Sequence, residues 1–353
     1  MNNLKNDIFI KACKRLPTER TPIWIMRQAG RYLPEYRAIR EKYDFLTMCK
    51  TPEVAAEVTI QPIDILDVDA AILFSDILVV PEAMGMKLEM HEGKGPIFEN
   101  PIRSESDFNK LKSFDPSNEL KYVLDAVKIT KRELNNRVPL IGFSGSPWTL
   151  LCYMVEGKGT KDFANVKKML YTAPSLAHKI LSKLSNLIAE YLSAKIENGC
   201  DAVQIFDTWG GILSQSDYLE FDLQYIHQTI QLVKRTSEPI IVFSKGVHHN
   251  FDKIVSFGAD VIGLDWTLNL TDVRRVVEDK VALQGNLDPT VLYANQEKIK
   301  IEAIKVLESY GYGNGHIFNL GHGILPNIEP ENVKALVRIV KEESKKFHSR
   351  KDL

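Results

Sequence analysis

The chain has 353 residues, of which 44% are hydrophobic and 26% are charged, and its formal net charge is −1. That length suits one α/β barrel, although two smaller domains would also fit. Because the charges nearly cancel, the chain has no global basic field for nucleic acid or for a membrane surface, so we expect neither as a partner and any anion site must be local.

The four cysteines are far apart in the sequence and form neither a Cys-x-x-Cys motif nor a zinc-type pairing with histidine. This pattern is typical of a reducing compartment. Residues 1–7 lack the apolar core of a signal peptide, and no apolar run approaches the roughly 20 residues of a membrane span. We therefore expect a soluble cytoplasmic protein.

Short apolar runs, each bounded by polar or turn residues, are candidates for buried strands. In chain order, these runs are residues 23–26, 70–74, 140–143, 202–206, 240–243, 261–264, 281–283 and 317–320. Near-continuous apolar runs indicate strands that are covered on both faces, as in a parallel sheet. Eight such runs favour a single-domain (β/α)8 TIM barrel over residues 1–353, because a doubly wound sheet usually stops at five or six strands.

The connections between the runs carry helical patterns. Apolar residues fall at helical spacing in residues 180–192, Gly199 stands where that helix would end, and residues 329–346 predict a closing helix. Residues 32–66 and 79–101 are long insertions after the first two strands, and the second predicts a hairpin. At the carboxyl ends of strands, these insertions would build one side of an active-site mouth.

The first apolar run ends in a basic loop. Arg27 closes the run, and Arg31 follows across an Ala-Gly pair. Gly30 and Pro34 interrupt any continuing helix or strand. Two guanidinium groups at one strand end predict an anionic ligand, although pairing with acids such as Glu35 would also explain them.

Residues just past each strand of a barrel face a common mouth. They include neither a metal-ligand cluster nor a glycine-rich phosphate loop. These strand-end positions are Arg27, Arg31, Ser75, Asp76, residues 144–148, Asp207, Thr208, Trp209, Ser244, Lys245, Asp265, Trp266, residues 284–288 and His322.

Some of these residues could have a structural role instead of binding a ligand. The same holds for Tyr153, which lies in the predicted helix after residues 144–148. Asp76 and Thr208 could each cap a following helix, and Tyr153 could be a core residue. His322 differs, because the glycines on either side of it let a backbone approach a ligand closely.

Seven motifs near these strand ends carry a further resemblance. They are MRQAGRYLPE at 26–35, FSDIL at 74–78, GSPWTL at 145–150, YMVEG at 153–157, FDTWGG at 206–211, QGNLDP at 284–289 and NLGHGI at 319–324. Together they resemble the motifs of the uroporphyrinogen decarboxylase family, and the resemblance spans essentially the whole chain.

The resemblance implies a (β/α)8 barrel, usually a homodimer, that removes carbon dioxide from the four acetate side chains of uroporphyrinogen III and leaves coproporphyrinogen III. It implies neither a metal nor an organic cofactor. Asp76 and Arg27 would be catalytic. The implied substrate-binding positions are Arg27, Gln28, Ala29, Gly30, Arg31, Tyr153, Thr208 and His322. Some relatives have Ser at position 208, where Thr keeps the hydroxyl and adds a methyl group.

The chemistry explains these residue types. Loss of carbon dioxide from a pyrrole acetate needs an electron sink, and protonation of the adjacent pyrrole carbon supplies one by making the ring cationic. An ionised Asp76 near the pyrrole N–H groups would stabilise that cation in the transition state. Arg27 and Arg31 would bind substrate carboxylates and oppose the rise in the pKa of Asp76 that burial causes. An arginine, a water molecule or a substrate carboxylic acid could donate the proton.

Two alternatives remain open at this point. A corrinoid or thiol methyltransferase on the same barrel would bind zinc through His and Cys, but the chain has no His-x-Cys pair. A non-catalytic tetrapyrrole-binding protein is the alternative from another class, since a fold does not prove an activity. Formation of a decarboxylated product separates a carrier from an enzyme.

Overall fold

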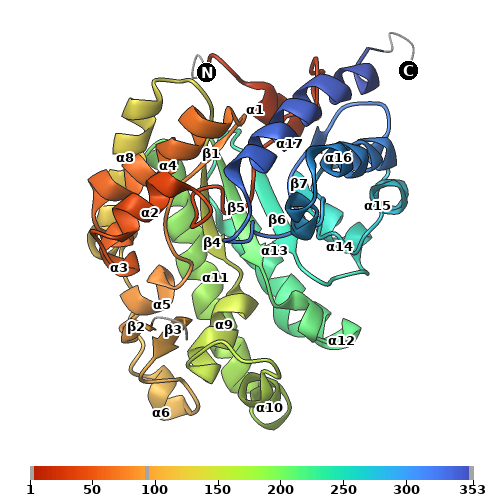
Figure 1. Ribbon diagram of the computed structural model, residues 1–353. Helices are drawn as coiled ribbons and strands as arrows, with labels where there is room; N and C mark the ends of the chain where they lie inside the picture. The colour runs from red at the N-terminus through yellow and green to blue at the C-terminus, as the bar shows by residue number, and fades with distance from the viewer. Residues whose placement is uncertain (1–3, 92–94, 350–353) are drawn as a thin grey trace.

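The centre of the protein is a curled sheet of parallel strands with helices covering its outer face (Figure 1). The computed structural model describes residues 4–91 and 95–349. The sheet has seven strands that lie side by side in chain order, and each of the seven later apolar runs overlaps one of them, the last at residue 317 alone. These strands are β1 (Ala71–Ile72), β4 (Leu140–Gly145), β5 (Ala202–Asp207), β6 (Ile240–Ser244), β7 (Val261–Gly263), β8 (Ala282–Gln284) and β9 (His316–Ile317).

The first apolar run is the exception to the predicted strands. Ile23 makes a single parallel bridge to Phe318, and its carbonyl accepts the Asp69 N–H at 2.8 Å. Farther along the run, the acceptor is a side chain instead of the backbone of a neighbouring strand: the Met26 N–H donates to Asn319 Oδ1 at 2.8 Å. The run therefore lies between β9 and the start of β1 without forming a continuous ladder.

Helices occupy the connections between the strands. The helices predicted at 180–192 and 329–346 are confirmed by α11 and α17, although the second ends in a 3-10 turn at Ser344–Phe347. Gly199 has a φ of +118° just after α11, which lets the chain turn toward β5. The α-helices are α1 (Ile8–Cys13), α2 (Pro34–Arg40), α3 (Phe45–Lys50), α4 (Pro52–Leu66), α5 (Val79–Ala83), α6 (Glu105–Phe108), α7 (Pro116–Glu119), α8 (Lys121–Leu134), α9 (Pro147–Glu156), α10 (Ala164–Thr172), α11 (Pro174–Glu197), α12 (Gln215–Tyr218), α13 (Gln224–Leu232), α14 (Phe251–Ser256), α15 (Leu270–Val277), α16 (Gln296–Tyr310) and α17 (Pro330–Glu343).

The long connection that follows β1 contains the predicted hairpin. Its antiparallel strands are β2 (Leu88–His91) and β3 (Gly95–Phe98). The Phe98 N–H donates to the Gly157 carbonyl at 2.6 Å, so the hairpin docks against the carboxyl end of α9. The other long connection, before β1, folds as α2, α3 and α4.

A separate apolar cluster fills the inside of the curled sheet. Ile241 and Phe243 of β6 belong to this inner cluster, whereas Val242 between them belongs to the outer core under the helices. Trp24 is buried in the inner cluster, and its Nε1–H donates to Gln284 Oε1 at 2.9 Å. The residues immediately past the strands are thus held on a packed base.

Candidate active site

The basic loop after the first apolar run is held in place by the Gln28 side chain. Gln28 is buried, its Oε1 accepts the Ile25 N–H at 3.1 Å, and its Nε2 donates to the Ala70 carbonyl at 3.0 Å. Its own carbonyl accepts the Tyr32 hydroxyl at 2.8 Å. The side chain of Gln28 therefore points into the fold and fixes the backbone between the two arginines.

Arg27 begins this loop. Its backbone has a φ of +64°, and its side chain is exposed. A Cβ atom on Gly323 would collide with Arg27 Cδ, so the stem of Arg27 lies against the loop after β9. A Cβ atom on Gly30 would stand 2.9 Å from the Arg27 carbonyl oxygen, which explains glycine there. Ala29 is half-buried beside it, and Arg31 is exposed on the same loop.

Asp76 follows β1 and keeps part of its surface accessible although protein surrounds it. The Leu78 N–H donates to its Oδ1 at 2.7 Å. Burial raises the pKa of the Asp76 carboxyl, and this N–H and the charge of Arg27 oppose the rise without cancelling it. Arg27 thus has the predicted electrostatic effect, but desolvation is the larger one.

Tyr153 lies on α9 and faces the same mouth. Its ring is half-buried, with its centroid 6.4 Å from that of Trp209 in an edge-on arrangement. Burial raises the pKa of Tyr153, the charge of Asp76 raises it further, and the charge of Arg27 lowers it. These mutual effects mean that the three ionisable groups lie within electrostatic reach of one another.

His322, in the loop after β9, is half-buried. Burial lowers the pKa of His322 to about 4, the charges of Arg27 and Lys245 contribute to the decrease, and Asp265 opposes it. Its ring centroid is 6.2 Å from that of Phe243. At neutral pH the side chain is therefore a neutral imidazole that can donate or accept a hydrogen bond.

Thr208 and Trp209 form the turn that follows β5, and both are half-buried. The Trp209 N–H donates to Thr149 Oγ1 at 3.4 Å, and the Trp209 ring reaches Tyr153, so the turn belongs to the same mouth. The structure places Arg31 on the exposed part of the basic loop and turns the side chain of Gln28 away. The predicted side chains gathered at the mouth are Arg27, Asp76, Tyr153, Thr208 and His322.

Asp207, the last residue of β5, connects the elements beneath this turn. It is buried, and its Oδ1 accepts the Ser146 hydroxyl at 3.1 Å and the Thr149 hydroxyl at 3.2 Å. Ser146 Oγ also caps α9 by accepting the Thr149 N–H at 3.0 Å. Asp207 thereby joins β5 to the helix that carries Tyr153.

Asp222, in the π-helical segment Leu219–Leu223, is a second buried carboxyl beside Asp207. Asp207 Oδ2 and both Asp222 oxygens have no hydrogen bond to the described residues. A Cβ atom on Gly210 would collide with Asp207 Oδ2 and stand 3.1 Å from Asp222 Oδ2, so both oxygens border one small space. Burial raises the pKa of each carboxyl, and the charge of Asp207 raises that of Asp222 further. These shifts favour one proton held between the two carboxyls, and the larger rise in the pKa of Asp222 favours Asp222 as its carrier.

The sequence offered little signal for this pair. Asp207 stands at a strand end, which marked it as a candidate, but Asp222 lies in a helical pattern where an acid normally faces solvent. Its burial depends on a partner from another element.

No three His, Cys, Asp or Glu side chains gather as metal ligands within residues 4–91 and 95–349. The four cysteines are free and buried, and burial raises the pKa of each thiol. The zinc-thiol alternative therefore has no ligand set in these residues. In the same ranges, no helix is both long and apolar enough to cross a membrane.

Comparison with protein families and curated proteins gives one consistent result. The family model described as uroporphyrinogen decarboxylase (URO-D) matches residues 4–343. The uroporphyrinogen decarboxylase of Chlorobium phaeovibrioides is 56% identical over 350 residues, which cover 98% of this chain and 100% of that protein. The uroporphyrinogen decarboxylase of Chlorobium luteolum is 57% identical with the same coverage.

Comparison with solved structures shows the fold. A methyltransferase from Methanosarcina mazei superposes with a TM-score of 0.80 at 21% identity, covering 96% of this chain and 99% of that one. A B12-independent methionine synthase from Shewanella sp. W3-18-1 superposes with a TM-score of 0.54 at 12% identity, covering 83% and 88%. At these identities the likeness concerns architecture and not chemistry.

Proposed function

The chain belongs to the uroporphyrinogen decarboxylase family, and we propose that it removes carbon dioxide from the four acetate side chains of uroporphyrinogen III to leave coproporphyrinogen III. It is a carboxy-lyase of tetrapyrrole biosynthesis. One observation supports our assignment of the reacting centre: Asp76 is a half-buried carboxylate beside Arg27, and the Leu78 N–H is its only hydrogen-bond donor within the described ranges.

In our mechanism, Asp76 stabilises the cationic intermediate. A proton adds to the pyrrole carbon next to an acetate, and the ring becomes positive. The bond between the acetate methylene and its carboxyl carbon then breaks, its electron pair enters the ring, and carbon dioxide leaves. Protonation of the exposed methylene gives the methyl group, and loss of the first proton from the ring carbon restores the neutral pyrrole. A carboxylate that has few protein donors can accept hydrogen bonds from pyrrole N–H groups and lies beside the positive charge when it forms.

Arg27 has two proposed roles at this centre. Its charge favours the ionised form of Asp76 against the effect of burial. Its guanidinium also binds a substrate carboxylate, together with Arg31 on the same loop. Gln28, Ala29 and Gly30 are proposed to act through the backbone, because the Gln28 side chain is occupied inside the fold.

Tyr153, Thr208 and His322 are proposed to orient substrate carboxylates by hydrogen bonds. A neutral His322 suits this role better than a cation would, because it can donate one hydrogen bond without competing with Arg27 for the carboxylate of Asp76. The half-buried positions of all three let them contact a ligand while their rings and stems remain packed.

Turnover of the reduced substrate tests the proposed function. We expect anaerobic incubation of the purified chain with uroporphyrinogen III, without added cofactor, to yield coproporphyrinogen III through partly decarboxylated intermediates that chromatography separates. Unchanged substrate after prolonged incubation would refute the enzymatic function and favour a binding protein. Stoichiometric zinc in the active protein would instead support the methyltransferase alternative.

We also propose the finer architecture that the family implies. The first apolar run, which bridges to Phe318, would complete the seven strands as a single-domain (β/α)8 barrel with insertions at 32–66 and 79–101. The chain would be a cytoplasmic homodimer. Light scattering coupled to size-exclusion chromatography tests the dimer, and a monomeric mass at assay concentration would refute it.

A further inference from the structure

Lys245 is a third basic side chain at the carboxyl ends of the strands, in addition to the two arginines of the proposed site. It directly follows β6, where its N–H donates to the Asp207 carbonyl at 3.0 Å. Its own carbonyl accepts the Gly211 N–H, also at 3.0 Å. The backbone of Lys245 is thus fixed on both sides by the turn after β5, which carries Thr208.

The ammonium group of Lys245 lies within electrostatic reach of His322. The charge of Lys245, like that of Arg27, lowers the pKa of His322. Lys245 Nζ is 5.5 Å from the ring centroid of Trp266, which is 38% exposed. Lys245 is half-buried as a residue, and the Trp266 ring lies on one side of its ammonium group.

No carboxylate of the described residues pairs with this ammonium group. Residues 4–91 and 95–349 contain no acid within 4.0 Å of Lys245 Nζ. Asp265, which lies on the neighbouring strand end, is already bonded, because its Oδ2 accepts the Gly246 N–H and its Oδ1 accepts the Thr267 N–H at 2.8 Å. A half-buried cation without a protein partner favours an anionic ligand.

We propose that Lys245 binds a carboxylate of the tetrapyrrole substrate. This inference rests on the proposed function and adds a binding residue to it. Arg27 and Arg31 belong to the loop after the first apolar run, which lies beside β9 and β1. Lys245 follows β6, which is the middle strand of the seven in the sheet. Cations at separate points of the mouth fix the orientation of a planar polycarboxylate better than cations on one loop.

Removal of the charge tests the proposal. We expect Lys245→Met to raise KM for uroporphyrinogen III about tenfold or more and to change kcat less than about threefold, since the lost contact is charge-assisted and is assigned to substrate binding. Lys245→Arg should recover most of the affinity. Added salt should raise KM less steeply in Lys245→Met than in the wild type.

Lys183→Met is the matched control. Lys183 is also half-buried over an aromatic ring, with its Nζ 5.8 Å from the centroid of Phe108, but it lies on α11 and donates to the Leu111 carbonyl. We expect KM to stay at the wild-type value in this variant. Thermal unfolding of each variant verifies that it is folded.

The kind of carboxylate follows from the product pattern. If Lys245 binds an acetate, Lys245→Met will slow one decarboxylation and accumulate one intermediate. If it binds a propionate, all four steps will slow alike. An unchanged KM in Lys245→Met, or an equal loss in Lys245→Arg, would overturn the proposal. Failure of the proposed function is distinguishable, because the wild type would then lack turnover, whereas anaerobic fluorescence titration with uroporphyrinogen would still report the affinity of each variant.

Discussion

Asp69 and Asp76 lie on either side of β1, and they differ in burial and in the number of hydrogen bonds that they accept. Asp69, before the strand, is fully buried and saturated with donors. Asp76, after the strand, is half-buried and receives one N–H from Leu78. In a barrel-like fold, the amino ends of the strands serve stability and the carboxyl ends serve chemistry. Asp69 and the proposed catalytic Asp76 follow this division.

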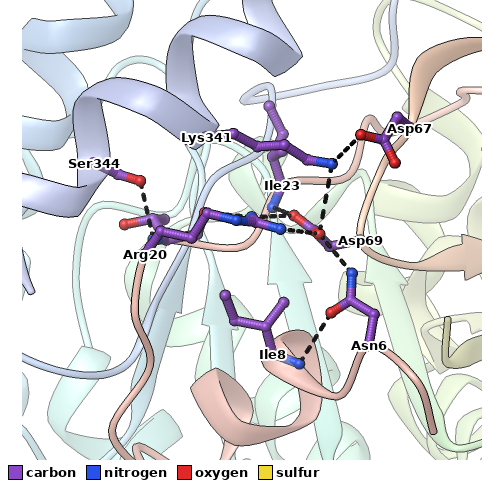
Figure 2. Close-up of polar contacts among 9 residues, drawn as sticks. Asn6, Ile8, Arg20, Ile23, Asp67, Asp69, Lys341 and Ser344 are labelled. Carbon is purple, nitrogen blue, oxygen red and sulfur yellow. Dashed lines mark hydrogen bonds and ion pairs between the residues drawn. The ribbon is translucent and has the colours of Figure 1, made fainter.

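Three residues donate hydrogen bonds to Asp69, and a fourth forms an ion pair with it (Figure 2). Arg20 donates to both carboxylate oxygens at 2.7 and 2.6 Å, Asn6 Nδ2 donates at 2.8 Å, and the Ile23 N–H donates at 2.9 Å. Lys341 of α17 lies 4.0 Å away. Asp69 therefore joins the amino-terminal segment to the closing helix, whereas Asp76, with its single N–H donor, has oxygen lone pairs left for the proposed ligand.

Removing the charge of Asp76 is expected to have the largest effect. Asp76→Asn should lower kcat about 1000-fold, because the neutral amide cannot stabilise a cation, while the affinity for uroporphyrinogen changes far less. Thermal stability should be equal or higher, because burial disfavours the ionised carboxylate in the folded state. Turnover assays, binding titrations and calorimetry measure the three quantities. Equal losses in kcat and affinity would make Asp76 a simple binding group.

The same substitution at Asp69 should lower the stability of the fold and leave turnover nearly unchanged. Asp69→Asn leaves the largely buried Arg20 without a counter-charge, so we expect the free energy of unfolding to fall by about 3 kcal/mol, as for other broken buried ion pairs. Because the site lies at the other end of β1, kcat/KM at room temperature should stay within about twofold. Urea denaturation and initial rates test both expectations.

Asp67→Asn is the matched control for this prediction. Asp67 also contacts Lys341, at 2.6 Å, but its side chain is 90% exposed. We expect a loss below about 0.5 kcal/mol, as is usual for an exposed pair. A comparable loss in both variants would contradict the assignment of the stabilising role to the buried carboxylate.

Asp207, beneath the site, is a third buried or half-buried aspartate to compare with Asp69 and Asp76. The ionisable group beside its carboxyl is another acid, Asp222, and not a cation. Asp222→Ala removes the shared proton and leaves Asp207 Oδ2 buried without a donor, so we expect a loss of about 2 kcal/mol. Asp222→Asn retains an N–H donor and should lose less than about 1 kcal/mol. Chemical denaturation compares the two variants, and equal losses would argue against a shared proton.

Continuous apolar runs predicted the existence of seven strands correctly, because a strand that is buried on both faces consists mostly of apolar residues. The first run failed as a strand because Asn319, nearly 300 positions away, bonds the Met26 N–H. No local pattern contains that partner.

The candidate site divides in the same way. Strand ends are local features, so Asp76 and His322 could be placed at the mouth from sequence. The inward direction of Gln28 and the proton shared by Asp222 depend on elements brought together by folding, and neither could be read from neighbouring residues.

Two histidines near β9 repeat the contrast between the ends of a strand. His316 begins β9, is fully buried, stacks on Tyr310 with 4.6 Å between ring centroids, and contacts the Gly285 carbonyl at 3.1 Å. His322 follows the strand and is half-buried at the mouth. Burial lowers the pKa of His316 to about 3 and that of His322 to about 4. Both are neutral when the protein is folded at neutral pH.

The pH dependence of stability separates the roles of these histidines. A depressed pKa in the folded state means that the unfolded chain takes up protons first, so the stabilisation is complete above pH 6.5 and is lost as pH falls toward the folded pKa. His316→Gln removes one titrating group, and we expect stability between pH 6.5 and pH 4 to fall less steeply by about 1 kcal/mol per pH unit, with KM unchanged. His322→Gln should flatten the same slope but also raise KM several-fold, about as expected for one lost hydrogen bond. Denaturation at stepped pH with parallel kinetics tests this. A wild-type slope in His316→Gln would show that its imidazole is already charged in the folded protein, and an unchanged KM in His322→Gln would remove His322 from the substrate contacts.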